Sequence, residues 1–465
     1  MKARAWRGWL PSRNVSVGKS VEAGPTPVVW SGRTDGLGER LCSILNSKLL
    51  AETIGWEFSF GWKDSNWLHD YRALENSVIG KIAVTNDFPA EEVFSSSFLR
   101  DFHKPKRPDG NFLPVQQMSS VADLESARRQ EGFAGLITGQ QLILEEIRRL
   151  GSGAGSPLSY PQVFRTIGFS DKYRRLQKLA RDAALPKNFI AIHLRSGDMV
   201  YGEPRKWGIW AKKVLVPAVA SDYIQRLTSM GFEVVVFAQN KEVSEILAAS
   251  PRVYSSTSFL PGVLLSNTEL AFFEMMMMSR SVAIISGASG FSRFAAMAGG
   301  ISFIEPNKEL SPNTLLSLVE ADSDREHRWD TFLSAYSWYQ AYKLNEQSLT
   351  GLEGISLLEN ATELDPRNNL YSVLLSALHY RIGNYTTADT IILDSQQMEG
   401  ADSIEQSEFL HLLLHQHPGN PPSLSGYFQD FVDASCHSDL AKFCGSRIID
   451  RFPDWPLSIP RDGGD

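Results

Sequence analysis

Residues 189–198 read FIAIHLRSGD, an apolar run that stops abruptly at a cluster of polar side chains. The apolar residues 189–192 predict a buried strand, and the polar cluster begins at His193. In an open α/β sheet, ligands bind just beyond the carboxyl ends of the strands, so we expect Arg195 to face a ligand. A guanidinium offers a planar fork of donors that suits phosphate. The alternative is an ordinary strand-end turn with a surface arginine and a buried histidine.

Strands and helices alternate regularly on both sides of this stretch. Short apolar runs predict strands at 27–30, 56–62, 79–84, 232–238, 252–255, 282–286 and 301–304. Helical spacing of apolar residues predicts helices from Glu39 onward and at 122–129, 136–150, 171–184, 210–219, 220–230, 242–249, 267–278 and 293–298. Such alternation is typical of parallel sheets covered by helices.

The predicted fold class is therefore α/β, with two facing Rossmann-like domains that have parallel sheets, followed by an all-helical C-terminal region. The expected division is a loose N-terminus at 1–25, a first Rossmann-like domain at 26–155, a linker and helix at 156–184, a second Rossmann-like domain at 185–320, and a helical tail at 325–465. The facing edges of the two domains would form the ligand cleft.

The helical tail carries one short pattern that suggests a repeat. A break at residues 365–368 (DPRN) separates two predicted helices, and the second, at 370–382, runs into the turn GNY at 383–385 with Ala388 three residues later. This spacing of aromatic and small residues resembles a tetratricopeptide unit. Since a stable stack takes about three units, a helical appendage packed on the second domain remains the alternative.

The composition of the chain excludes several classes of protein. The 465 residues carry a formal net charge of −7, which disfavours a general nucleic-acid-binding surface. A run of about 20 apolar residues, as a membrane span requires, does not occur, and the basic start lacks the apolar core of a signal peptide. The three cysteines, Cys42, Cys436 and Cys444, have neither zinc-ligand spacing nor the even number of a disulfide set. We therefore expect a cytoplasmic protein.

Three blocks of sequence together resemble one family. GLGERL at 36–41 follows the first predicted strand, HLRSGD at 193–198 follows the central one, and EMMMMSRSVAIISGASGFSRFAA at 274–296 contains a further strand and a Gly/Ser-rich turn. In this order they are similar to the fucosyltransferase superfamily that includes the α-1,2-, α-1,6- and protein O-fucosyltransferases. The resemblance spans about residues 26–310 and leaves out the helical tail.

The resemblance implies a GT-B architecture and a GDP-sugar, such as GDP-fucose, as donor. It further implies metal-independent transfer with inversion at the anomeric carbon, and no cofactor besides the donor substrate. The acceptor would be a hydroxyl of a glycan or polysaccharide, and the helical tail would be available to a protein partner. No nucleic acid is expected as a partner.

The same resemblance assigns donor-binding residues. Arg195 would contact the β-phosphate of the donor. The rest of the donor site would comprise a histidine, two acids and the turn before a helix, namely His193, Asp198, Glu274, Ser289, Gly290, Phe291 and Ser292. Backbone N–H groups at such a turn suit phosphates. The alternatives are a core histidine, a solvent-facing acid at 274 and an ordinary Gly/Ser turn.

The departing diphosphate constrains the chemistry. Its growing negative charge has to be neutralised by a divalent cation or by arginine together with backbone N–H groups. The single Asp-x-Asp pattern, at residues 322–324, lies outside both predicted sheets in a charged linker. A metal is therefore disfavoured, and Arg195 is expected to take that role.

The acceptor hydroxyl needs a base, or a group that orients it. Members of the resembled family carry Asn after the second glycine of the first block, where this chain has Glu39. Glu39 is our candidate base, with pairing to Arg40 or a favourable charge at a helix N-terminus as alternatives. Asp35 and Glu203 are rival bases. The acceptor side would comprise Asp35, Gly36 and Gly38.

Two short stretches depart from the resembled family. The strand at 232–238 leads into Gln239 and Asn240, where relatives often have two acids, and Arg293 stands where they often have an aromatic residue. The extra arginine would add a phosphate contact or alter the sugar preference. The leading interpretation is a GDP-sugar transferase. The alternatives are a transferase of the same fold for another nucleotide sugar, and a non-catalytic scaffold with this fold.

Overall fold

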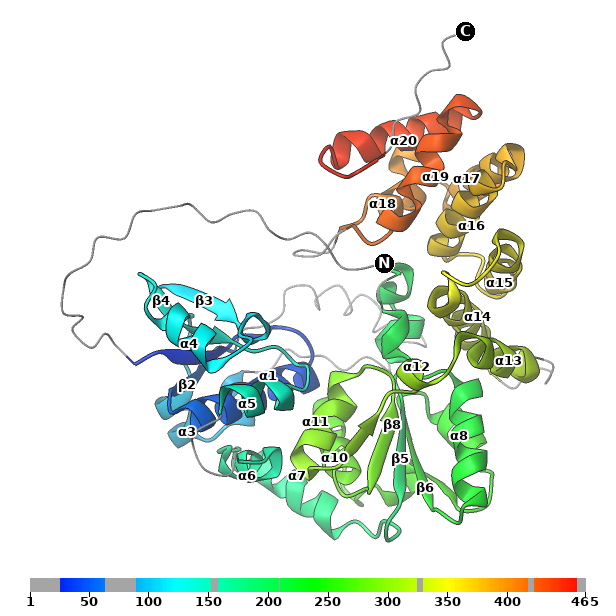
Figure 1. Ribbon diagram of the computed structural model, residues 1–465. Helices are drawn as coiled ribbons and strands as arrows, with labels where there is room; N and C mark the ends of the chain where they lie inside the picture. Colours follow the sequence, from blue (N-terminus) through cyan, green and yellow to red (C-terminus); the bar gives the residue numbers. More distant parts are fainter. Residues whose placement is uncertain are drawn as a thin grey trace.

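The structure is a computed structural model that describes residues 26–62, 89–151, 158–208, 210–323, 329–416 and 422–457. Within these ranges lie two parallel sheets with their helices, and a helical tail stacked above the second sheet (Figure 1). The predicted fold class, two Rossmann-like domains of GT-B type and a helical C-terminal region, is confirmed. The strand predicted at 79–84 and the N-terminus at 1–25 lie outside the described residues.

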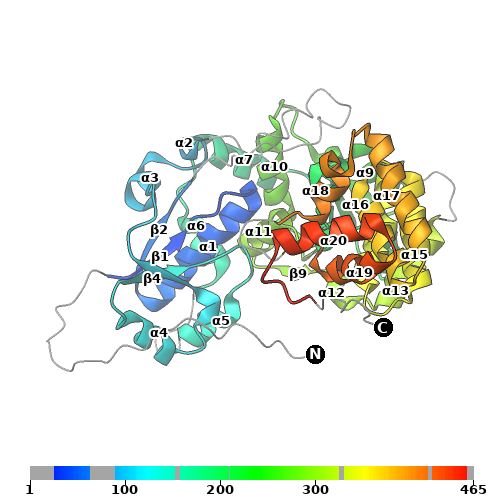
Figure 2. The ribbon, with the colours of Figure 1, turned by 90° about the horizontal axis from the view of Figure 1, so that it is seen from above.

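The first sheet has the strand order β2-β1-β4-β3, and every neighbouring pair is parallel. Its strands are β1 (Val28–Ser31), β2 (Glu57–Phe60), β3 (Asn111–Pro114) and β4 (Phe133–Ile137). Its helices are α1 (Leu37–Ile54), α2 (Ala90–Val93), α3 (Ser96–Phe102), α4 (Val121–Arg128), α5 (Leu144–Leu150) and α6 (Tyr160–Thr166). Helix α1 is buried along nearly its whole length, because it lies between this sheet and the second domain (Figure 2).

The helix predicted at 136–150 is wrong in its first half. Residues of β4 lie there in the sheet, and α5 begins only at Leu144. Gly135 lets β4 approach β1, since a Cβ at that position would lie 1.8 Å from the carbonyl oxygen of Val28. A strand of five residues with a glycine at its centre is too short to show an alternating pattern of its own.

The second sheet has the strand order β7-β6-β5-β8-β9, again entirely parallel. Its strands are β5 (Ile190–Leu194), β6 (Val234–Ala238), β7 (Val253–Ser255), β8 (Ala283–Ser286) and β9 (Ser302–Ile304). Its helices are α7 (Asp171–Asp182), α8 (Pro217–Ser229), α9 (Lys241–Leu247), α10 (Asn267–Met278), α11 (Gly290–Gly299) and α12 (Pro306–Glu309). The winding direction reverses between β5 and β8, and ligands of such sheets bind outside the carboxyl ends at that reversal.

The helix predicted at 210–219 is also wrong in part. The chain forms a single 3-10 turn at Ala211–Lys213, and α8 begins only at Pro217. Proline is favoured in the first turn of a helix and disrupts its interior. Pro217 therefore marks a helix start and not a point inside a longer helix.

Strand β5 separates two hydrophobic cores by its alternating side chains. Ile190, Ile192 and Leu194 pack with α8 and the helical tail. Ala191 packs on the other face, in a core that includes α10, α11 and the first domain. The second sheet is thus covered on one face by the tail and on the other by elements that join it to the first domain.

The helical tail consists of α13 (Pro312–Ser323), α14 (Thr331–Asn345), α15 (Gly351–Leu364), α16 (Asn369–Arg381), α17 (Tyr385–Glu399), α18 (Glu408–Leu413), α19 (Phe428–Asp433) and α20 (Asp439–Arg451). The predicted break at 365–368 is confirmed, since it separates α15 from α16. The tetratricopeptide assignment stays a prediction. Among the helices in the described ranges, none combines the length and apolar character that a membrane span requires.

Ion pairs tie the tail to the segment that follows β5. Arg205 Nε donates to Asp365 Oδ2 at 3.1 Å, and Lys206 Nζ donates to Glu408 Oε1 at 2.7 Å. The side chain of Asp365 is only 4% exposed and that of Arg205 only 13%. This part of the tail therefore forms one core with the second domain and fixes the segment that leaves β5.

We predict that Asp365→Ala destabilises the whole second domain. The substitution removes one partner of a buried ion pair and leaves the charge of Arg205 in the shared core. The free energy of unfolding should fall by about 3–5 kcal/mol in urea denaturation. The control is Glu245→Ala, which breaks the exposed pair with Lys241 and should cost less than about 0.5 kcal/mol. Equal losses in the two variants would contradict this account of the tail.

Candidate functional site

The reversal point of the second sheet is held together by a buried hydrogen-bond chain. His193 of β5 lies beside Ser286 of β8 in the parallel register, and its Nδ1 is 3.1 Å from Ser286 Oγ. Ser286 Oγ donates to the His193 carbonyl, and Ser292 Oγ donates to Ser286 Oγ at 2.9 Å. The His193 ring stacks on Phe291 with 4.9 Å between centroids. These contacts fix the Gly/Ser-rich turn against the end of β5.

His193 is neutral over the physiological pH range. Burial, together with the smaller effect of the nearby charge of Arg195, lowers the pKa of its imidazole to about 3. A neutral ring with these partners suits a structural histidine, which was one of the two alternatives. Direct contact between His193 and a donor stays a prediction.

Arg195 lies directly beyond β5 and reaches toward the first domain. Its Nη1 donates to Glu39 Oε1 at 3.3 Å, and its side chain is 16% exposed. Lys213 Nζ lies 3.5 Å from the same Glu39 oxygen. Two cations of the second domain thus meet one carboxylate of α1, in the gap where the ligand cleft was predicted.

Glu39 is a poor candidate for a general base in this arrangement. Burial alone would raise its pKa, but the charges of Lys213 and Arg195, with a backbone hydrogen bond, lower the pKa to about 2. A carboxylate of such low pKa takes up a proton reluctantly near neutral pH. The predicted base role is therefore opposed by the geometry, and the alternative of a pairing with Arg40 stays a prediction. Arg40 donates to the carbonyls of Thr34 and Asp35.

The N-termini of α1 and α11 approach each other at two glycines. A Cβ on Gly38 would lie 2.6 Å from the backbone N and Cα of Phe291, and a Cβ on Gly290 would lie 2.5 Å from the Glu39 carboxyl carbon. Neither position therefore tolerates a side chain without movement of the backbone or of Glu39. Gly38 and Gly36 were both predicted on the acceptor side. In the structure Gly38 lies at the contact between the two domains. Gly36 is the N-cap residue of α1.

The predicted phosphate-binding turn carries a buried hydroxyl. Ser289 is the N-cap residue of α11, but its side chain makes no capping hydrogen bond, and its Oγ is buried without a hydrogen-bond partner in the described structure. The Oγ of Ser196, the residue after Arg195, is also buried without a hydrogen-bond partner in the described structure. Buried polar groups are normally satisfied. Ser289 and Ser196 therefore leave two buried hydroxyls without hydrogen-bond partners among the described residues, one of them at the N-terminus of α11.

Glu274 lies beside the carboxyl end of β7. Ser256, the residue after that strand, donates to Glu274 Oε1 at 2.8 Å. Burial raises the pKa of Glu274 to about 7, and the hydrogen bond from Ser256 offsets part of that rise. The predicted alternative of a solvent-facing acid does not describe this half-buried carboxyl.

The remaining predicted residues are placed as follows. Asp35 forms an ion pair with Arg33, so its carboxylate is already engaged. The side chains of Asp198 and Glu203 lie outside the described structure, and their predicted roles are unchanged. Arg293 is buried, lies over the Phe303 ring and points its Nη1 to the Gln140 carbonyl of the first domain. Its contacts are structural and join the two domains.

The residues after β6 also have structural contacts. Asn240 caps α9 through Oδ1 and donates from Nδ2 to the Tyr201 hydroxyl at 2.9 Å. A Cβ on Gly197 would lie 2.3 Å from Gln239 Oε1. The end of the Gln239 side chain thus packs directly on Gly197, so the segment after β5 lies against the end of β6.

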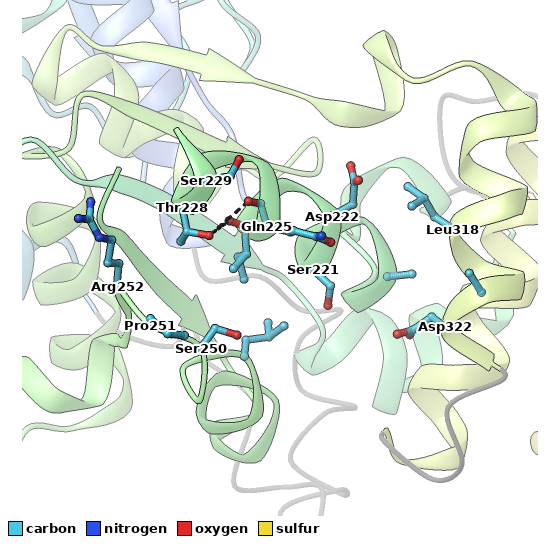
Figure 3. A pocket seen from close by; sticks show the side chains of 14 residues that line it. Ser221, Asp222, Gln225, Thr228, Ser229, Ser250, Pro251, Arg252, Leu318 and Asp322 are labelled. Carbon is cyan, nitrogen blue, oxygen red and sulfur yellow. Dashed lines mark hydrogen bonds between the residues drawn. The ribbon is translucent and has the colours of Figure 1, made fainter. Parts of the chain in front are cut away.

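The Asp-x-Asp pattern lies away from the reversal point. Asp322 lines a hollow of about 620 Å³ between α8, α13 and the residues that precede β7, among them Arg252 (Figure 3). The Trp329 indole donates to Asp322 Oδ2 at 2.5 Å, and Asp324 lies outside the described residues. Within the described ranges, no group of three or more His, Cys, Asp or Glu side chains gathers in a metal-binding arrangement.

Lys213 is the main residue that the sequence interpretation missed. It belongs to no long helix or strand, and it lies eighteen positions after Arg195 in a segment predicted as helix. Its neighbour Trp210 gives the only local signal, since Lys213 Nζ lies 4.1 Å from the Trp210 ring centroid.

Comparison with known proteins gives remote structural likenesses. No protein-family model matches the chain, and no curated protein matches it. A crystal structure of the fucosyltransferase NodZ from Bradyrhizobium is similar with a TM-score of 0.33 and 15% identity, covering 58% of this chain and 92% of that chain. A crystal structure of POFUT1 in complex with GDP-fucose is similar with a TM-score of 0.29 and 12% identity. The likeness covers 61% of this chain and 99% of that chain. At these TM-scores the likeness carries no argument about activity.

We predict a pH dependence of stability that is due to Glu274. The pKa of Glu274 is raised in the folded state. Its contribution to the free energy of unfolding is therefore fully present below the ordinary pKa of 4.5 and is lost as the pH rises to about 7. Glu274→Gln, which resembles the protonated carboxyl, should lose less stability than the wild type across that window. Urea midpoints at several pH values measure the difference. Glu125→Gln on the exposed side of α4 is the control, and parallel profiles for wild type and Glu274→Gln would refute the prediction.

Proposed function

We propose that the chain is an inverting, metal-independent glycosyltransferase that moves fucose or a related sugar from a GDP-sugar to a hydroxyl of a glycan or polysaccharide. The observation that carries the proposal is the position of Arg195. It lies at the reversal point of a doubly wound sheet, faces the other domain and adjoins, through Glu39, the N-terminus of α11. The sequence resemblance to fucosyltransferases around HLRSGD supports the choice of sugar.

The proposed reaction is a single displacement. The acceptor oxygen attacks the anomeric carbon, the bond from that carbon to the phosphate oxygen breaks, and the acceptor proton passes to a base. Negative charge then grows on the β-phosphate of the departing GDP. Arg195, the Ser289 hydroxyl and the N–H groups that open α11 are the groups placed to stabilise that charge.

The proposed nucleotide position lies along the carboxyl ends of β5, β6 and β7. Glu274 and Ser256 would contact the base at the end of β7, where a carboxyl is held half-buried. Glu203 remains as the proposed acceptor base, because Glu39 is held as a low-pKa carboxylate between two cations and Asp35 is paired with Arg33. Asp198 is proposed as a donor-binding residue on the strength of the resemblance alone.

We predict that Arg195→Lys lowers turnover of GDP-fucose by about 10²–10³-fold, the loss typical of removing one transition-state donor. Lysine keeps a charge opposite Glu39 but lacks the bidentate fork, so folding should be preserved. Release of GDP from GDP-, UDP- and ADP-sugars, with mass spectrometry of the acceptor, measures the activity. Arg128→Ala on the exposed side of α4 is the control. A preference for UDP- or ADP-sugars would indicate another transferase, and no binding of any of these would indicate a scaffold.

We also predict that EDTA leaves turnover unchanged. The proposed charge neutralisation comes from side chains and backbone N–H groups, so removal of divalent cations should not alter kcat. Assays with EDTA and with added Mg²⁺ or Mn²⁺ test this point. A loss of activity in EDTA that Mg²⁺ or Mn²⁺ restores would rule out the metal-independent mechanism while leaving the donor open.

A further inference from the structure

The position of Lys213 has no explanation in the predicted donor site. Its side chain is 18% exposed, and its Nζ lies 3.5 Å from the Glu39 oxygen that Arg195 also contacts at 3.3 Å. Lysine and arginine carry like charges, so their approach to one point is favourable where an anion lies there. Glu39 is that anion in the structure, and its carboxylate also packs on Gly290 at the start of α11.

The surroundings of Lys213 hold it in this position. Gln340 of α14, fully buried, donates from Nε2 to the carbonyls of Ala211 at 2.5 Å and Val214 at 2.8 Å, on either side of Lys213. The Lys213 carbonyl packs so closely on Gly287 that a Cβ there would lie 2.3 Å away. The Trp210 ring lies against the ammonium group. The tail on one side and the Gly/Ser-rich turn on the other therefore fix the backbone that carries this cation.

We propose that Lys213 is the second cation of a diphosphate cradle formed with Arg195, and that Glu39 holds the two cations together in the free protein. This inference rests on the proposed function for the identity of the donor, but the cradle itself requires only a diphosphate. Two monovalent cations supply the charge of one divalent metal ion, which a single arginine does not. The buried Ser289 hydroxyl and the N-terminus of α11 adjoin the same point and give hydrogen-bond donors to a diphosphate.

The experiment compares Lys213→Met with Lys212→Met, its neighbour whose side chain is exposed. Isothermal titration calorimetry with GDP, inorganic pyrophosphate and guanosine separates the cradle from the base contacts. Lys213→Met should weaken GDP and pyrophosphate binding by about 10–100-fold, the loss of a hydrogen bond to a charged group, and leave guanosine unchanged. Lys212→Met should stay within about twofold of the wild type, because exposed charges are screened. Thermal unfolding of both variants checks that they fold.

The Glu39→Gln variant tests whether Lys213 binds pyrophosphate or only neutralises the charge of Glu39. Removal of the carboxylate should tighten pyrophosphate binding, because the two cations lose their internal anion. Lys213→Met should still weaken binding in the Glu39→Gln background. If that effect disappears, Lys213 serves only to neutralise Glu39, and the cradle is overturned.

The outcomes distinguish this inference from the proposed function. Pyrophosphate binding that depends on Lys213, in a protein that turns over neither GDP-fucose nor any other GDP-sugar, supports the cradle and overturns the function. Turnover of GDP-fucose with equal binding by the two lysine variants supports the function and overturns the cradle. Failure of the wild type to bind either GDP or pyrophosphate overturns both.

Discussion

The contact between the N-termini of α1 and α11 is the constraint on which the arrangement of the site depends. Gly38 and Gly290 leave no room for side chains at this contact. Because the two helices come together there, Glu39 of the first domain reaches Arg195 and Lys213 of the second. A side chain at either glycine would separate the helix ends and remove the carboxylate from the cations. The charge pattern of the cleft is therefore a consequence of backbone packing between the domains.

The helical tail takes part in this arrangement through the chain that leaves β5. Arg205 and Lys206 pair with tail acids, and Gln340 holds the backbone around Lys213. Arg195 and Lys213 are thus the two ends of a segment whose middle is fixed by the tail. A tail that served only to recruit a partner would need no buried ion pair with that segment. Its contacts hold the segment between Arg195 and Lys213 in place.

The features that could be predicted from the sequence are those that depend on residues close together in the chain. Strands β5, β6 and β8 are apolar runs buried on both faces, and the rule for strand ends placed Arg195 at the cleft without further information. Strand β4 was missed because Gly135 interrupts a short apolar run, and β3 was missed because its four residues form too short a pattern. Helix α8 begins at Pro217, later than the apolar pattern predicted. Lys213 could not be predicted, since its position depends on Gln340, more than a hundred residues away.

The role of Glu39 shows why a residue type at an expected position does not settle its chemistry. A carboxylate at the start of a helix facing a cleft has the right type and place for a base. Two cations at hydrogen-bonding distance reverse that inference, because they stabilise the ionised form that a base must give up when it takes a proton. In the proposed cradle the same two cations bind a diphosphate, so the pairing that lowers the pKa of Glu39 and disqualifies it as a base also makes its carboxylate a substitute for the phosphate in the free protein. Proton transfer and charge neutralisation then belong to different side chains in the proposed reaction.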